Sequence, residues 1–229
     1  LGAALAVGLS YTAAFVLAAL PFCSKKSSLQ AFSGRWRSAL AKEMVANGSA
    51  EGLSEVGTGV TTFLFNITLM RYAGELGVAA FTAVSYLAFV SNNILIGLAD
   101  GVGAIVSYNY GLGSLERVKK AFRLAAFSAV AIGAGIFAVL FFFAREIILL
   151  FLDEGNAVVL EFAVYGARLY ALAFVLSGVN IVASGYFTAV CRPKNAAAIA
   201  ISKGVLWVGV CLVVLPAVLG VRGIWITVP

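Results

Sequence analysis

Acidic, hydroxyl and amide side chains recur at helical spacing inside one apolar stretch of the chain. They are separated by 4, 3, 4 and 4 positions, which at 100° per residue keeps them within about 80° of one another on a helix. The set is Glu51, Glu55, Thr58, Thr62 and Asn66. Carboxylates and amides aligned in this way can hold a proton, a metal cation or a cationic solute. The alternative for Glu51 and Glu55 is solvation by headgroup water at a membrane interface.

A second polar face follows in the next apolar stretch. Its members fall within a sector of about 100° on a helix, and they are Ser85, Asn92, Asn93, Asp100 and Ser107. Asp100 is expected about 10 Å from the inner end of its helix, at a depth comparable with that of Glu55. Glu55 and Asp100 could then share a proton or a sodium ion. The alternative is that Asp100 caps a helix or forms an ion pair at its end.

Beside Asp100, Gly97 and Gly101 form a small-xxx-small pair, which predicts close helix packing or, as the alternative, a break in a helix that lines a site. Further along, Glu161 and Arg168 share one helical face, and a second face carries Ser177, Asn180, Ser184 and Thr188. An arginine about 15 Å inside a span needs a partner. The candidates are Glu161 in sequence and Asp100 or Glu55 in space, and a fixed structural ion pair is the alternative to a functional role.

Several kinds of chemistry are excluded by the residues present. The chain contains no histidine, and its three cysteines are widely spaced, so neither a zinc site nor a disulfide framework is expected. No catalytic triad can be assembled, and we expect neither an enzyme nor a bound cofactor. The Gly111–Gly113 pair follows no strand, so a helix end and a turn explain it better than a nucleotide site.

The composition requires lipid as the main solvent. Of the 229 residues 62% are hydrophobic and only 11% are charged, with a mean hydropathy of +1.02, whereas soluble domains are about a quarter charged. Runs of about 20 apolar residues recur, which predicts transmembrane helices. We therefore expect an all-α polytopic membrane bundle with six full spans and the start of a seventh. The six are Leu1–Phe22, Gly52–Met70, Leu76–Ser107, Ala121–Phe143, Val158–Val190 and Ala196–Leu219.

The basic residues predict how these spans are oriented. Twelve of the 16 lysines and arginines fall in alternate loops, and such loops face the cytoplasm. The loops expected inside are 23–50, 108–120 and 191–195, with Arg123 and Lys203 just beyond them. The opposite loops hold only Arg71, Arg145 and Arg222. These basic clusters flank spans, so we do not expect nucleic-acid binding.

The longest loop has apolar residues at helical spacing, at Leu29, Phe32, Trp36, Leu40 and Met44. This pattern predicts an amphipathic helix on the inner membrane surface that joins two bundles. The chain begins at Leu1 inside an apolar run and ends at Pro229 inside another. We interpret it as a piece of a longer polypeptide.

Several short motifs occur in an order that resembles the multidrug and toxic compound extrusion (MATE) transporters, and the resemblance extends across nearly the whole chain. The motifs are Asn47-Gly48-Ser49 with Glu51-Gly52, Phe65-Asn66, Gly97-Leu98-Ala99-Asp100-Gly101 with Ser107-Tyr108-Asn109-Tyr110-Gly111, Gly185-Tyr186-Phe187-Thr188-Ala189 with Pro193, and Leu215-Pro216 with Gly220 and Gly223-Ile224-Trp225.

The resemblance implies twelve helices in two six-helix lobes. On that plan residues 1–22 are the last helix of the N-terminal lobe, residues 23–50 are the cytoplasmic linker, and residues 51–229 are the C-terminal lobe, truncated in its last helix. Such proteins export cationic, amphiphilic drugs and metabolites across the plasma (inner) membrane in exchange for sodium or protons. A monomer with only lipids and a small cationic substrate as partners is expected.

Combined with the polar faces, the resemblance assigns candidate binding roles to a small set of residues. Carboxylates would bind the coupling cation or the substrate, with sodium possible at Glu55 and Asp100, and amides would donate neutral hydrogen bonds. The set is Glu51, Glu55, Asn66, Asn92, Asp100, Arg168 and Asn180. Two alternatives remain: a lipid-linked saccharide flippase of the same superfamily, which needs a more cationic cavity, and a membrane scaffold that transports nothing.

Overall fold

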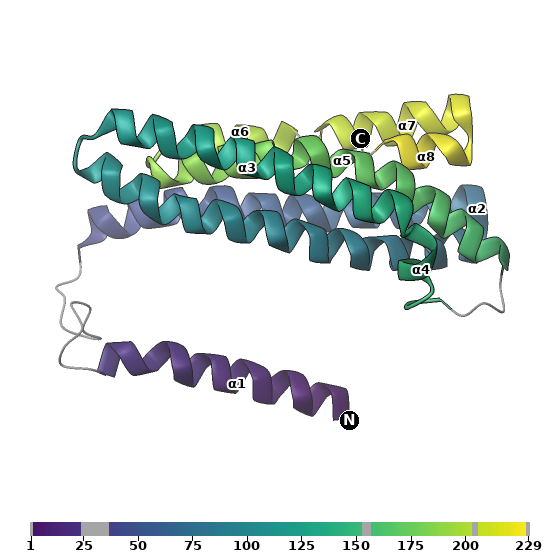
Figure 1. Ribbon diagram of the computed structural model, residues 1–229, viewed down its shortest axis with the longest axis horizontal. Helices are drawn as coiled ribbons and strands as arrows, with labels where there is room; N and C mark the ends of the chain where they lie inside the picture. The colour runs from purple at the N-terminus through teal and green to yellow at the C-terminus, as the bar shows by residue number, and fades with distance from the viewer. Residues whose placement is uncertain (1, 24–36, 153–156, 203–205, 228–229) are drawn as a thin grey trace. The chain divides into compact units, whose positions relative to one another are not determined.

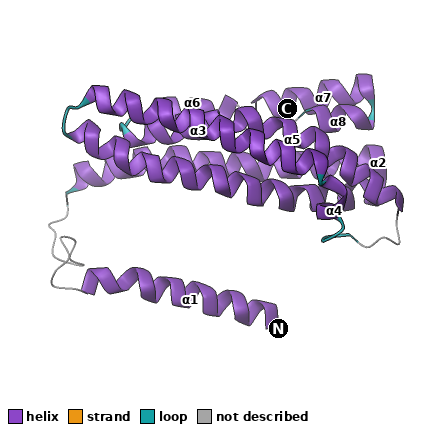
Figure 2. Ribbon diagram, viewed as in Figure 1, coloured by secondary structure: helices purple, strands orange, loops and turns teal. Residues whose placement is uncertain are grey.

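A computed structural model describes residues 2–23, 37–152, 157–202 and 206–227, and every regular element in these ranges is a helix (Figures 1 and 2). The prediction of an all-α bundle is confirmed. In chain order the helices are α1 (Gly2–Cys23), α2 (Ser38–Gly111), α3 (Leu115–Phe142), α4 (Ala144–Ile148), α5 (Ala157–Ala189), α6 (Pro193–Ile201), α7 (Trp207–Leu219) and α8 (Val221–Ile226).

Helix α2 contains two membrane spans joined at a sharp reversal. Gly74 has φ 63° and ψ −157°, a conformation that residues with a Cβ atom rarely adopt. Around Gly74 the chain doubles back, so that a first arm (residues 43–73) runs antiparallel to a second arm (residues 75–111) (Figure 1). The two arms correspond to the predicted spans Gly52–Met70 and Leu76–Ser107.

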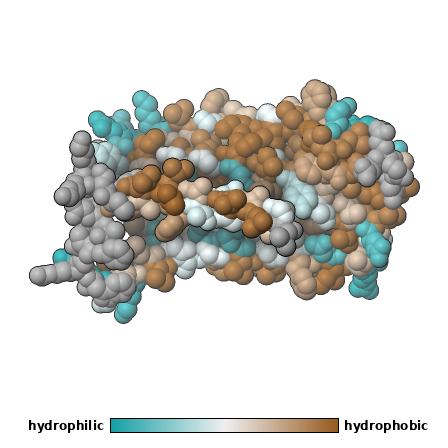
Figure 3. Space-filling view, turned by 90° about the horizontal axis from the view of Figure 1, so that it is seen from below, coloured by the Kyte–Doolittle hydropathy of each residue, from teal (hydrophilic) through white to brown (hydrophobic). Residues whose placement is uncertain are grey.

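Within the described residues, α2, α3 and α5 are long and apolar enough to cross a membrane, and Ala4–Leu20 and Trp207–Leu219 are shorter apolar stretches. A space-filling view shows how these apolar helices affect the surface (Figure 3). Hydrophobic side chains cover most of the visible face, and much of the hydrophilic surface lies toward its ends. Such a surface is suited to hydrocarbon between two polar interfaces.

Contacts divide the chain into two compact units, residues 1–42 and 43–229. The first unit contains α1, whose described side chains are almost all exposed. Of the predicted surface helix, Leu29, Phe32 and Trp36 lie outside the described residues. Leu40 and Met44 lie on α2, which begins at Ser38 and continues without interruption into the first arm. Residues 38–50, predicted to belong to the linker, are therefore continuous with the first arm of α2.

Helix α5 is the centre of the second unit, because its buried residues contact the other helices along its whole length. Near one end Phe81 packs between Phe65 and Trp225, with ring centroids 5.0 and 6.2 Å away. Near the other end Val106, Val118 and Val190 form a small cluster. The turns after α2 and after α5 therefore lie at one end of the bundle, and Gly74 lies at the other.

Glycines allow the closest helix contacts. A Cβ atom on Gly133 of α3 would clash with the carbonyl oxygen of Phe174 on α5, and one on Gly166 would lie 2.6 Å from the Trp225 ring. Gly97 and Gly101 behave differently, since a Cβ on either would meet no described atom within 4 Å. The prediction that these two glycines pack helices together is wrong for this unit. The alternative of a helix break is also not observed, because only Gly74 is non-helical inside α2.

Two helix boundaries differ from the predicted spans. Helix α3 begins at Leu115 and so includes a basic stretch that was predicted to be loop. After α3 the chain forms α4, a single short helix that anchors Ala144 and Ile148 in the core. The sequence does not predict α4, because five residues are too few to show a periodic pattern.

Candidate functional site

The first arm of α2 presents the predicted polar face outward from its unit. Glu51, Glu55, Thr58 and Thr62 are exposed, and Asn66 is half-buried. The threonines and the asparagine donate to carbonyl oxygens one turn earlier: Thr58 to Ser54 at 3.1 Å, Thr62 to Thr58 at 2.9 Å, and Asn66 to Thr62 at 2.8 Å. The two hydroxyl donors and one N–H of the Asn66 amide are therefore satisfied within the helix. The carboxylates of Glu51 and Glu55 have no hydrogen-bond or ion-pair partner among the described residues, so they are available to a ligand.

The second arm carries its acid in a similar environment. Asp100 is exposed and contacts no polar partner in the described part of the chain, and Asn92 is half-buried. Asn93 donates to the carbonyl oxygen of Phe89 at 2.8 Å. The buried side of this arm is occupied by Leu95 and other apolar residues. Asp100 is thus a second unpaired carboxylate on the unit surface.

The two arms do not bring Glu55 and Asp100 to one level. Phe65 stacks on Phe81, and ten residues from that pair the first arm reaches Glu55 while the second reaches Ser91. Asp100 lies nine residues beyond Ser91, roughly 13 Å further along the helix. Sequence reasoning had placed the acids at equal depth because it counted each helix from an assumed membrane edge. In the folded hairpin Glu55 is level with Ser91 and Asn92.

Asn47 is a polar residue to which sequence reasoning gave no role. Its Nδ2 donates to the carbonyl oxygen of Thr188 at 3.1 Å, which ties the start of the first arm to the last turn of α5. Its Oδ1 is buried and accepts no hydrogen bond from a described residue. Asn47 precedes Glu51 by one helical turn, so the same four-residue spacing could have identified it. The contact fixes the first arm against α5 immediately beside the acidic face.

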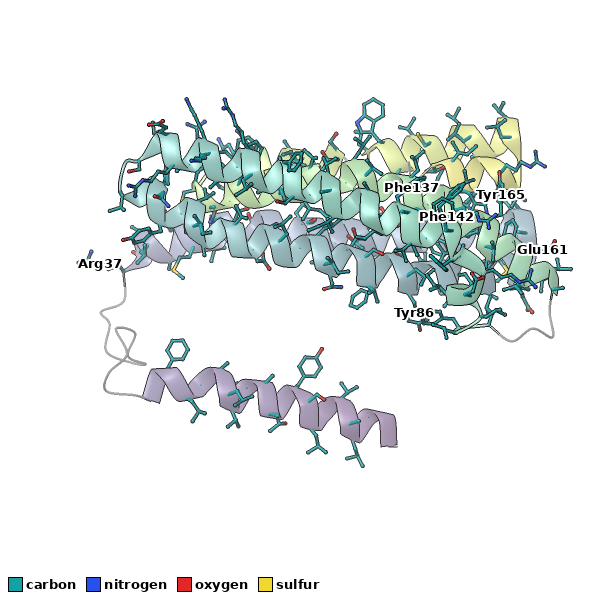
Figure 4. All side chains as sticks on the ribbon, in the orientation of Figure 1. Arg37, Tyr86, Phe137, Phe142, Glu161 and Tyr165 are labelled. Carbon is teal, nitrogen blue, oxygen red and sulfur yellow. The ribbon has the colours of Figure 1, made fainter. Side chains whose placement is uncertain are left out.

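Arg168, on α5, contacts the C-terminal end of α3 and forms no ion pair with a described residue. Its Nε donates to the carbonyl oxygen of Phe141 at 3.1 Å, and its guanidinium carbon lies 5.7 Å from the centre of the Phe141 ring. Phe141 is in the last turn of α3, where carbonyl groups lack helical partners and a positive charge is favourable. No carboxylate of the described residues pairs with Arg168. Glu161 is exposed nearer the N-terminal end of α5 (Figure 4).

Replacing Arg168 with alanine is expected to lower the stability of the bundle by about 1 kcal/mol, because the Phe141 carbonyl loses its donor. The thermal midpoint of the purified protein measures this, with Arg145→Ala as control because Arg145 is exposed on α4. Arg168→Lys should recover part of the loss. An unchanged midpoint together with an altered substrate range would instead place Arg168 in a binding cavity.

The residues of the second polar face predicted on α5 differ in how far they are buried. Asn180 is exposed, whereas Ser177 is half-buried and its hydroxyl oxygen has no hydrogen-bond partner within the described ranges. Thr188 donates to the carbonyl oxygen of Ser184 at 3.1 Å. Of these four residues only Asn180 is exposed.

A void inside the second unit lies between α2, α3 and α5, is lined by apolar residues such as Val84, Leu140 and Phe174, and leaves no room for a water molecule. No group of three or more His, Cys, Asp or Glu residues is assembled within the ranges that the structure describes. Any site formed by the acidic residues is therefore open on the surface of this unit.

Comparison with known proteins identifies the fold and the family. The MatE family profile matches residues 53–213, which is more than half of the chain. The chain belongs to the MatE family. The resemblance predicted from the sequence motifs is thereby confirmed.

Individual relatives agree with this assignment. The multidrug export protein MepA of Staphylococcus haemolyticus (strain JCSC1435) is 26% identical over 226 residues, covering 97% of this chain and 49% of MepA. A MATE structure in complex with MaL6 has a TM-score of 0.91 at 20% identity, covering 99% of this chain and 52% of that one. An outward-facing multidrug resistance MATE transporter has a TM-score of 0.90 at 21% identity, covering 99% of this chain and 51% of that one. The chain spans about half the length of the curated relatives it matches.

Proposed function

We propose that this MatE chain is part of a secondary active exporter that expels cationic or amphiphilic compounds in exchange for sodium or protons by alternating access. The observation that carries the proposal is a set of exposed, unpaired carboxylates on the arms of α2: Glu51, Glu55 and Asp100. A carboxylate within a membrane span is costly unless it faces water, a ligand or protein. Export is also the activity in the name of MepA.

In this proposal the acids attract the coupling cation or the positive group of the substrate. Asn66, Asn92 and Asn180 lie half-buried or exposed on α2 and α5 and contribute neutral hydrogen bonds. The substrate and the ion are the partners, the plasma (inner) membrane is the site of action, and no further cofactor is needed. The protein acts as a monomer, because the two lobes of a single polypeptide can rock around a central site.

The flippase alternative is less well supported. A lipid-linked pyrophosphate requires cationic groups in the cavity, and Arg168 already donates to the α3 backbone at Phe141. Three unpaired acids on the same unit would repel a phosphate. The charge of the exposed faces therefore favours a cationic cargo over an anionic one.

A flux assay in proteoliposomes tests the proposal. An imposed sodium or proton gradient should drive uptake of a fluorescent organic cation into vesicles that contain the intact protein, and a matched neutral dye should accumulate less. Dissipating the gradient with an ionophore should stop uptake. Uptake that is unaffected by either gradient would exclude ion exchange, and no uptake of any cation would favour a scaffold.

A further inference from the structure

The N-terminal turns of α3 carry four exposed cations: Arg117, Lys119, Lys120 and Arg123, which we call the basic turn. None of them forms an ion pair with a described carboxylate, although Glu116 lies on the same turns. As residues three and four apart are neighbours on a helix, the basic turn concentrates positive charge on a small surface. That surface has no role in the proposed function.

Directly beyond the basic turn the exposed side of α3 becomes apolar. Leu124 is 66% exposed and Phe127 is 73% exposed, and on the helix they lie one turn beyond Lys120 and Arg123 respectively. Large apolar side chains this exposed on a membrane helix face acyl chains. The change from Arg123 to Leu124 therefore marks the boundary between headgroups and hydrocarbon.

Aromatic residues at the same end support this boundary. Tyr108 is 69% exposed and Tyr110 is 40% exposed in the last turn of α2, and the backbone N–H of Ser114 donates to the carbonyl of Asn109 to close the turn into α3. Val106 and Val118 lie in one cluster on antiparallel helices, so Tyr108 is close to the level of Glu116 and Arg117. Exposed tyrosines are enriched at the headgroup level.

We infer that the basic turn of α3 binds the headgroup of an anionic phospholipid, whose acyl chains lie along Leu124 and Phe127. The side chains of Lys120 and Arg123 hold the phosphate, and the apolar residues one turn further hold the chains. A zwitterionic lipid fits less well, because its ammonium group would face the same cations. The positive-inside distribution places this turn in the cytoplasmic leaflet, where anionic lipids are concentrated. Figure 4 shows nitrogen-tipped side chains projecting from this end of α3.

Bromolipid quenching of a tryptophan reporter tests the inference. In the intact protein carrying Leu124→Trp, dibrominated phosphatidylglycerol should quench the added fluorescence at a lower mole fraction than dibrominated phosphatidylcholine. Adding Lys120→Gln and Arg123→Gln should reduce this preference about 25-fold, at roughly fivefold per cation near the surface. Arg145→Gln, on α4 just beyond the opposite end of α3, should leave it unchanged.

Two results would overturn the inference. Equal quenching by the two lipids, or a preference that survives the double substitution in a protein with normal thermal stability, would show that the basic turn does not select headgroups. Reversal of the preference by millimolar inorganic phosphate would indicate a free-anion site instead of a lipid site. A Val139→Trp reporter near the other end of α3 should show no preference in any case.

Discussion

Gly133→Ala is expected to destabilise the protein by about 1–3 kcal/mol, and Gly133→Val to prevent folding. The added Cβ would clash with the carbonyl oxygen of Phe174 and lie 2.9 Å from its carbon and 3.1 Å from the Cα of Val175. These atoms belong to the backbone of α5, so no change of rotamer relieves the clash. Helices α3 and α5 would have to separate along the centre of the bundle. The thermal midpoint in detergent measures the loss.

The same helix provides a matched control. A Cβ on Gly135 would meet no described atom within 4 Å, so Gly135→Ala should be neutral or slightly stabilising, because alanine favours a helix more than glycine does. Gly166→Ala should fall between the two, since its clash is with the side chain of Trp225. Equal midpoints for Gly133→Ala and Gly135→Ala would contradict the observed packing of α3 on α5.

The membrane bundle could be predicted because long apolar runs and asymmetric basic loops are local features. Contacts between distant parts of the chain could not be predicted from such local features. Both Gly133 and Gly97 fit a small-residue pattern in the sequence. Nothing near either residue shows that Gly133 packs against the backbone of another helix while a Cβ on Gly97 would meet no described atom within 4 Å. Their roles depend on which helix face meets α5, which is decided by the whole bundle.

Some features of the candidate site could likewise be predicted from the sequence, and others could not. The spacing of Glu51 and Glu55 predicts that they share one helix face, since a single helix determines its own periodicity, and both are exposed in the structure. The level of Asp100 relative to Glu55 depends on the reversal at Gly74, and the partner of Arg168 depends on where α3 ends. Neither can be obtained from one helix alone.

On the proposed function, neutralising the acids one at a time is expected to lower ion-driven export at least tenfold without lowering stability. Glu55→Gln and Asp100→Asn keep the shape of each side chain and remove its charge. Because neither carboxylate has a polar partner among the described residues, no structural contact is lost. The initial rate of gradient-driven uptake should fall about tenfold or more, the loss expected for a charged hydrogen bond. Glu116→Gln, an exposed acid at the start of α3, should retain full flux.

The separation of the two acids determines what the variants can show. A proton or an ion shared by two carboxylates requires oxygen atoms about 3 Å apart, whereas Glu55 and Asp100 lie roughly 13 Å apart along the helix axes. On the proposed function they would act as separate stations, so each single variant should lower ion-driven export by itself. The double variant should be no worse than either single one, because the exported cation would have to pass both stations. Full drug resistance in both single variants, at normal membrane abundance, would remove Glu55 and Asp100 from the mechanism.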